Sequence, residues 1–307
     1  MSSNRRSIAL TDEKKIIERS FDRVYGRRRL IQKCLFMLFR LAALINCAGL
    51  FLVVSFIALK GYKAISWEFL TQPPIDSMTK GGILPCIIGT LCLGIGSIIV
   101  ALPIGVASAI YLNEYASPGR ILRLIRLSIS NLAGVPSVVF GLFGFAFFVI
   151  YLKMGVSILA GVLTLASLTL PVIIGSTEEA LKSVPDTYRE ASLALGATRW
   201  QTIYRVVLPA ALPGTLTGAI LGLSRAAGET APVMFTAAVF FTPGLPVSVF
   251  DKIMAMPYHI YVLATAGTNI EATRPLQYGT SLLLIAMVLG MNLVAIVWRS
   301  VLRKRMK

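Results

Sequence analysis

Six apolar segments, each long enough to cross a lipid bilayer, constrain the fold of this chain more than any other feature. A spanning helix needs about 20 apolar residues, and helices or closed barrels alone satisfy their backbone hydrogen bonds within lipid. Hydrophobic residues make up 56% of the 307, charged residues only 14%, and the mean hydropathy is +0.75. An ordinary soluble globular domain is excluded by this composition. We therefore predict an all-α integral membrane protein with six transmembrane helices near residues 35–59, 83–112, 127–152, 157–176, 209–241 and 280–300.

The distribution of basic residues predicts the orientation of these helices. Of the 30 Lys and Arg residues, 23 lie in residues 1–40, 113–126, 177–208 and 299–307, and six lie in the alternate segments. Because cytoplasmic loops carry an excess of Lys and Arg, both termini are expected in the cytoplasm. The formal charge of +16 is thus a topology signal, with some affinity for anionic membrane lipid and none expected for nucleic acid.

The same pattern divides the chain into four parts. They are a cytoplasmic N-terminal arm at 1–34, a first transmembrane helix with an exterior loop at 35–82, a core of five transmembrane helices at 83–300 and a basic cytoplasmic tail at 301–307. The arm fits either an interfacial helix on the cytoplasmic leaflet or a brace against partner subunits. The four cysteines have no metal-like spacing and the lone histidine, His259, has no partner ligand nearby in sequence, so no metal site is expected.

A polar hairpin at 177–208 interrupts the apolar pattern. An acidic residue, two small residues, a Gly and a distant Leu-Pro recur there at fixed spacing, as Glu190, Ala191, Ser192, Gly196, Leu208 and Pro209. This pattern resembles the EAA loop of ABC-importer permeases, with conservative departures at Ser192 and Val206. The resemblance implies a cytoplasmic coupling loop that docks into a separate ATPase subunit. An ordinary amphipathic loop is the alternative.

Individual residues of this hairpin carry further expectations. Small side chains at Ala191, Ser192 and Gly196 keep one side of a short helix slim enough to enter a groove, and Gly196 is expected to end that helix. Glu190 is the candidate for a charged contact with the ATPase, the alternative being a surface ion pair with Arg189. Asn113 and Glu114, at the end of the second span, are expected to contact the loop.

Two charged residues, Arg225 and Glu229, lie within the fifth apolar stretch. A charge near the bilayer centre costs roughly 2.5–3.5 kcal/mol, so each is expected to face a partner or a watery path. Spaced four apart, they can pair with each other. Alternatively, Arg225 attracts an anion while Glu229 positions it or gates the path, since a guanidinium suits phosphate or sulfate oxygens.

Three blocks extend the resemblance to phosphate-specific importer permeases, in particular to the PstA-type subunit. They are residues 131–143, 170–180 and 224–232. The resemblance implies a type I ABC importer permease architecture in the bacterial inner membrane, with a substrate path that includes Arg225, Glu229, Thr230 and Ser137. It further implies a PstC-type second permease, a PstB-type ATPase dimer and a PstS-type extracytoplasmic phosphate-binding protein as partners.

The sequence contains no Gly-x-x-x-x-Gly-Lys-Ser/Thr phosphate loop, so we expect a non-catalytic subunit that binds no cofactor, with ATP on the partner ATPase. The predicted function is ATP-driven uptake of inorganic phosphate. Another oxyanion, such as sulfate or molybdate, is an alternative that Arg225 would serve equally. An ion-coupled secondary transporter needing no ATPase is a further alternative, against which the coupling loop argues.

Two packing questions stay open at this point. Gly214, Gly218, Gly222 and Ala226 form a small-residue ridge that permits close helix approach, either to a second permease or within this subunit. Gly134, Pro136 and Ser137 are expected either to break the third span, turning backbone N–H groups and the Ser137 hydroxyl toward a polar path, or simply to end it.

Overall fold

The computed structural model describes the backbone of residues 2–75, 80–242, 244–266 and 270–305, and most side chains from Gln32 onward. The chain forms two compact units, Met1–Phe56 and Ile57–Lys307, which are described separately. The four-part division expected from the sequence stays a prediction.

The first unit is helical throughout. Helix α1 runs from Ser2 to Gly61 and includes the first candidate span, Gln32–Ala64. The backbone of the arm and that of the first span form one unbroken helix, and no proline interrupts it before Pro73. The side chains of residues 1–31 lie outside the described part, so an amphipathic role for the arm stays a prediction. All residues from 32 to 53 are exposed, as suits a helix that faces lipid or another subunit.

The regular secondary structure described in the second unit is helical, except for one short hairpin of β1 (Pro74–Ile75) and β2 (Lys80–Gly81) and an isolated bridge between Ala238 and Ile253. Its long helices are α3 (Leu84–Ile110), α6 (Ile158–Lys182), α9 (Leu208–Gly228) and α12 (Ile270–Arg305). Its shorter helices are α2 (Trp67–Thr71), α4 (Arg120–Ala133), α5 (Ser137–Gly144), α7 (Asp186–Ala194), α8 (Arg199–Thr202), α10 (Ala231–Thr236) and α11 (Met256–Thr265). A 3-10 turn, η1 (Tyr62–Ala64), and three π-helical segments, η2 (Tyr111–Tyr115), η3 (Phe145–Tyr151) and η4 (Ile203–Val207), complete it.

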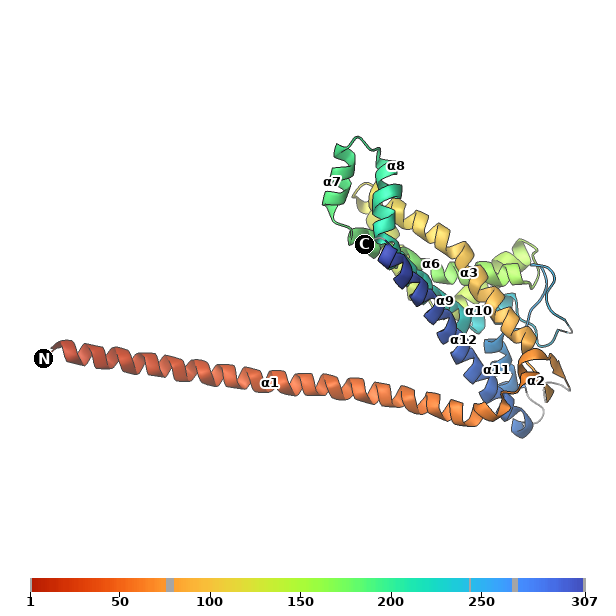
Figure 1. Cartoon of the computed structure of the whole chain (residues 1–307), viewed down its shortest axis with the longest axis horizontal. Coiled ribbons are helices and arrows are strands. Elements are labelled where there is room, and N and C mark those ends of the chain that lie inside the picture. Colours follow the sequence, from red (N-terminus) through yellow and green to blue (C-terminus); the bar gives the residue numbers. More distant parts are fainter. Residues whose placement is uncertain (1, 76–79, 243, 267–269, 306–307) are drawn as a thin grey trace. The chain divides into compact units, whose positions relative to one another are not determined.

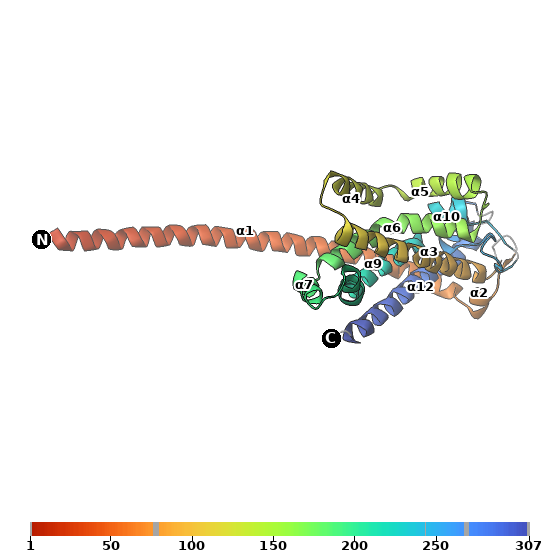
Figure 2. The same cartoon turned by 90° about the horizontal axis from the view of Figure 1, so that it is seen from above.

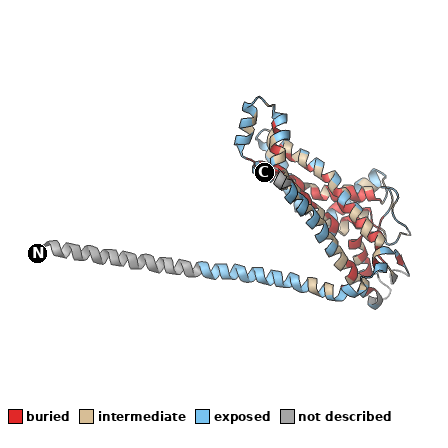
Figure 3. Cartoon of the chain, viewed as in Figure 1, coloured by how far each residue is buried: buried red, intermediate tan, exposed pale blue. Residues whose placement is uncertain are grey.

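Helices α3, α6 and α9 lie side by side and form the core (Figure 1). Buried residues concentrate on them, whereas α7 and α8 are mostly exposed (Figure 3). Within the described residues, five helices are long and apolar enough to cross a bilayer, and a bent pair provides a sixth. The prediction of an all-α chain with up to six spans is therefore confirmed.

The small-residue ridge of α9 packs inside this subunit. A Cβ on Gly218 would overlap Ser176 of α6, and one on Gly214 would overlap Ala180 of the same helix. Glycine is needed at these positions because the two helices touch almost backbone to backbone. The structure thus decides a question that the sequence left open.

The third span, expected near 127–152, is not one continuous helix. Helix α4 ends at Ala133, α5 begins at Ser137, and the two are bent by 100°. Pro136 is the cause, because it cannot donate a helical hydrogen bond and it pushes the preceding residue out of helical geometry. The 15 residues from Ser137 to Tyr151 reach only about 22 Å. Of the two alternatives left open by the sequence, the structure has the break, whereas the role given to its N–H groups stays a prediction.

The fifth and sixth spans also have different bounds from those expected. The fifth ends at Gly228 rather than near residue 241, because Glu229 is extended and a separate helix, α10, begins at Ala231 with Pro232 in its first turn. The sixth begins at Ile270, about ten residues before the expected start. Helices α5 and α10 pack together beside α6 (Figure 2). His259, on α11, is 4% exposed and serves packing.

Candidate coupling and substrate-path sites

The predicted coupling loop folds as a helical hairpin, α7–Gly196–α8, that projects from the core (Figure 1). Gly196 has a φ of +83°. Its N–H donates to the Leu193 carbonyl, and the Ala197 N–H donates to the Ser192 carbonyl. These two bonds close the end of α7 in a Schellman motif. The expectation that Gly196 ends this helix is confirmed.

The small residues of the hairpin do not share one surface. Ser192 Oγ lies 2.9 Å from Thr202 Oγ1, so Ser192 faces inward and joins α7 to α8. Ala191 and Glu190 are exposed on α7. The Glu190 carboxylate makes no hydrogen bond or ion pair with any residue that the structure describes. The slim outer face therefore comprises Ala191 and the Gly196 turn, without Ser192.

Leu208 and Pro209 begin the long helix α9 directly behind the hairpin. The π-helical segment η4 precedes them. A proline ring at this position would clash with the carbonyl four residues earlier in a regular helix, and the wider π-helical turn relieves that clash. The Leu-Pro pair thus marks the point where the hairpin continues into a core helix.

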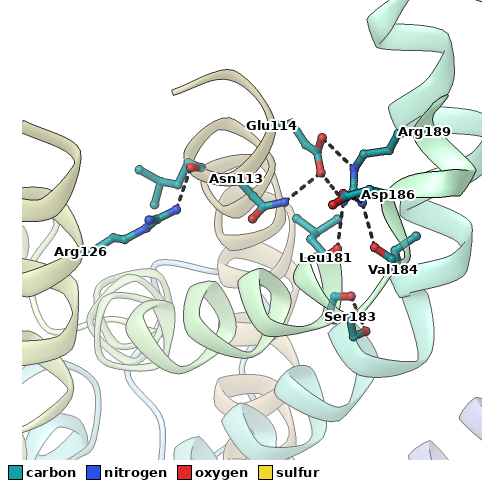
Figure 4. A network of polar contacts seen from close by, with 10 residues as sticks. Asn113, Glu114, Arg126, Leu181, Ser183, Val184, Asp186 and Arg189 are labelled. Carbon is teal, nitrogen blue, oxygen red and sulfur yellow. Dashed lines mark hydrogen bonds and ion pairs between the residues drawn. The ribbon is translucent and has the colours of Figure 1, made fainter. Parts of the chain in front are cut away.

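A polar network ties the base of the hairpin to the end of α3 (Figure 4). Arg189 Nη2 donates to Glu114 Oε1 at 2.8 Å and Arg189 Nε donates to Glu114 Oε2 at 3.3 Å. Asn113 Nδ2 also donates to Glu114 Oε1, at 2.8 Å. The hydrogen bonds to Glu114 raise the pKa of Arg189 above its ordinary value, against the opposing effect of partial burial. Arg189 therefore pairs with Glu114 and not with Glu190, and the expected contact between Glu114 and the loop is confirmed.

A second charged cluster joins α4 to α6. Arg126 Nη2 lies 2.7 Å from Glu178 Oε1, and Lys182 Nζ lies 3.5 Å from the same oxygen. Arg126 Nη2 also donates to the Leu112 carbonyl at 3.1 Å. The Arg126–Glu178 pair was missed in the sequence, although a Glu and a Lys four apart on an apolar helix were a visible signal.

Arg225 and Glu229 form an ion pair at the end of α9. Arg225 Nε donates to Glu229 Oε1 at 3.4 Å, and the two side chains are 32% and 15% exposed. Arg225 lies in the last helical turn, where the carbonyl ends favour a cation. Among the described residues, nothing hydrogen-bonds its two terminal nitrogens. Glu229 thus holds the guanidinium through Nε, and Nη1 and Nη2 have no hydrogen-bond acceptor among the described residues.

The two other predicted path residues, Thr230 and Ser137, lie at the starts of the short helices α10 and α5. Thr230 is half-buried and precedes α10, and Ser137 is half-buried at the start of α5. A Cβ on Gly141 of α5 would contact Pro232 of α10, so the two helices approach closely there. No hydrogen bond joins Ser137 or Thr230 to Arg225 in the part of the chain that the structure describes.

Polar contacts between α9 and α12 were not anticipated. Ser224 Oγ donates to Asn292 Oδ1 at 2.7 Å, and Arg299 Nη1 donates to Thr217 Oγ1 at 2.7 Å. The side chain of Asn292 was a signal in the sequence, because an amide within an apolar span is expected to have a partner.

One groove is unsuited to an anion. It measures about 510 Å³ between α4, α5 and α6. Its lining residues are apolar except Ser167, whose hydroxyl already donates to the Leu163 carbonyl. Within the described residues, no three His, Cys, Asp or Glu side chains are placed to hold a metal ion.

Comparison with known proteins identifies the family of this chain. Residues 101–307 match the family described as binding-protein-dependent transport system inner membrane component. The chain belongs to this family. It is accordingly an ABC transporter permease and a multi-pass membrane protein.

Relatives match the permease over most of its length. It is 36% identical to the phosphate transport system permease protein PstA of Mycobacterium leprae, covering 91% of this chain and 92% of the relative. It is 33% identical to the probable ABC transporter permease protein YqgI of Bacillus subtilis, covering 87% and 95%. It is 30% identical to PstA of Xylella fastidiosa, covering 89% and 93%.

Solved structures show the fold of the permease. A bacterial alginate ABC transporter in complex with a pentasaccharide-bound periplasmic protein matches with a TM-score of 0.59 and 16% identity, covering 90% of this chain and 96% of that chain. The inward-facing methionine transporter MetNI matches with a TM-score of 0.55 and 20% identity, covering 72% and 94%. The expected type I ABC importer architecture is thereby confirmed.

Proposed function

We propose that this permease carries inorganic phosphate, received from an extracytoplasmic binding protein, across the bacterial inner membrane into the cytoplasm. The observation that carries the proposal is its similarity to PstA phosphate transport permeases over about nine tenths of both lengths. Arg225 supports an anionic cargo, because its terminal nitrogens offer a planar set of donors to oxyanion oxygens.

The proposed complex divides the work among several chains. A PstC-type permease completes the path, a PstB-type ATPase dimer binds and hydrolyses ATP, and a PstS-type protein delivers phosphate. This chain catalyses no reaction and binds no cofactor. The hairpin docks into the ATPase through Glu190, Ala191 and Gly196, with Ser192 holding its two helices together and Leu208-Pro209 leading into α9.

In the proposed path, Arg225 attracts the anion and Glu229 orients the guanidinium. Thr230 and Ser137 supply hydroxyl groups on the helices beside it. Binding to this path must be weak, because transport requires release as well as capture. A partly exposed Arg225 that shares its charge with Glu229 suits this requirement.

Uptake of labelled phosphate by the reconstituted complex tests this proposal. We expect wild-type uptake to depend on ATP and to persist in excess unlabelled sulfate. Arg225→Gln should reduce uptake roughly tenfold or more, since hydrogen bonds to charged groups contribute about 1.5–3 kcal/mol. Arg120→Gln, at an exposed position of α4, is the matched control and should leave uptake nearly unchanged.

A double variant separates a substrate role from a structural ion pair. If the pair is only structural, removing both charges in Arg225→Gln/Glu229→Gln should restore uptake, because neither charge is then buried alone. If Arg225 attracts the anion, the double variant stays inactive. If unlabelled sulfate competes with phosphate in the wild type, the cargo is oxyanions more broadly and not phosphate alone. If uptake proceeds without ATP, the protein is a secondary transporter.

A further inference from the structure

The hairpin helix α7 has little to hold it in place except polar contacts. None of its nine residues is buried. Isolated helices of this length are marginally stable. Among the described residues, the Ser192 hydroxyl pairs with Thr202, within the hairpin itself. Apart from the packing of α7 against α8 and η4, Arg189 supplies the hydrogen bonds that join α7 to the ends of the core helices among the described residues.

Arg189 joins three elements through five hydrogen bonds. Two go to Glu114 at the end of α3, and one goes from Nη2 to the Leu181 carbonyl of α6 at 3.0 Å. The other two go from Nη1 to the Val184 carbonyl at 2.9 Å and to Asp186 Oδ1 at 3.1 Å. The guanidinium thus fixes the start of α7 against the ends of both α3 and α6.

Burial separates the two carboxylates that Arg189 contacts. The Glu114 side chain is 11% exposed and that of Arg189 is 18% exposed, whereas the Asp186 side chain is 88% exposed. Shielded, bidentate Arg–carboxylate pairs are strong and geometrically specific. Exposed pairs are weak and screened by salt. The Glu114 pair is therefore the firm contact and the Asp186 pair is the weak one.

We propose that the Glu114–Arg189 pair is the joint through which movement of the hairpin reaches α3. The inference rests on the proposed function, because it assumes that an ATPase moves α7. Glu114 lies in η2, the π-helical segment that directly continues the 27-residue helix α3, so displacement at this end can pass into α3 through a continuous helical backbone. Arg126 of α4 also donates to the Leu112 carbonyl at this end of α3, but this bond joins α3 to α4 and does not involve the hairpin. Glu114 and Arg189 are thus positioning residues that need not touch the substrate.

Coupling efficiency in the assembled complex tests the joint. We compare phosphate moved per ATP hydrolysed in Glu114→Gln and in the control Asp186→Asn, each of which removes one carboxylate from Arg189. Glu114→Gln should assemble and hydrolyse ATP but move roughly fivefold less phosphate per ATP, at the lower end of typical coupling effects. Asp186→Asn should match the wild type. An assembled Glu114→Gln complex with wild-type stoichiometry would overturn the proposal.

A distance measurement tests the joint without altering it. Spin labels are placed at exposed Tyr111 and Tyr188 by Cys substitution, in a chain whose four native cysteines are replaced and which retains ATP-dependent uptake. The Tyr111–Tyr188 distance should stay constant when ATP binds, because hairpin and α3 move together. A change of several ångströms would overturn the joint. Failure of wild-type phosphate uptake would instead overturn the proposed function alone, since the response of this distance to ATP is measured without any cargo.

Discussion

At the scale of single residues, neighbours in sequence have opposite surroundings. Arg189 turns toward the core and contacts Glu114, whereas Glu190 is exposed on α7. One residue of helical rotation, about 100°, accounts for this difference. The structure thereby removes Arg189 as a partner of Glu190 and leaves that carboxylate available to a partner subunit.

His259 provides a residue-scale prediction on pH. Burial lowers its pKa to about 4 from 6.5. Below pH 6.5 the unfolded state therefore binds a proton that the folded state does not, and stability falls as the pH drops toward 4. The loss is at most about 1.4 kcal/mol per pH unit. We expect the thermal midpoint of the purified protein to decrease as the pH is lowered from 7 to 5.

The variant His259→Phe is the control for this effect. It removes the single histidine of the chain, so its midpoint should decline less over the same range. Equal slopes for the two proteins would show that His259 does not titrate on unfolding.

At the scale of elements, α9 combines a tightly packed body with an interrupted end. Its glycines allow α6 to approach, and the break after Gly228 places Arg225 and Glu229 at a helix terminus. Broken helices at membrane depth are tolerated where they are buried in protein or line a water-filled path. The break therefore suits a transport path better than an uninterrupted helix over 209–241 would.

Gly218→Leu tests the packing of α9 on α6. We expect a loss of about 1–3 kcal/mol in stability, because added atoms would overlap Ser176 and force the helices apart. Gly290→Leu on α12 is the matched control, since no atom lies within 4 Å of a Cβ built at Gly290. The thermal midpoints of the two purified variants give the comparison. Equal midpoints would show that α9 does not need its glycine there.

At the scale of the whole molecule, the charge pattern and the hairpin lead to the same orientation. The hairpin residues belong to a Lys- and Arg-rich segment, which the positive-inside rule assigns to the cytoplasm. A docking site for a cytoplasmic ATPase requires that side as well. We therefore expect the segment containing α2 to lie outside.

Thiol labelling tests this orientation. In a chain whose four native cysteines are replaced, Trp67→Cys and Leu195→Cys place thiols at positions that are 80% and 90% exposed. A membrane-impermeant reagent added to right-side-out vesicles should label the first variant and spare the second until the vesicles are opened. Labelling of Leu195→Cys in sealed vesicles would reverse the topology.

Local features were predictable from the sequence. The apolar spans follow from the length and polarity that a bilayer demands of each segment. The role of Gly196 in ending α7 was predictable because that position requires a positive φ, which glycine adopts readily. Pro136 likewise signalled a break, though not the 100° bend between α4 and α5, because the angle depends on what the two helices pack against.

Tertiary structure decided which distant residues meet. Glu114 and Arg189 are 75 positions apart, and their pairing depends on where α3 ends relative to α7. The small residues of α9 would allow any helix to approach closely, and in the folded chain the helix that packs against them is α6. The sequence by itself therefore determined the class of protein, the spans and the local turns, since bilayer and backbone constraints act on contiguous residues. The partners of Arg189, Ser224 and the ridge were set only by folding, because a side chain's chemistry limits its possible partners without specifying where they lie.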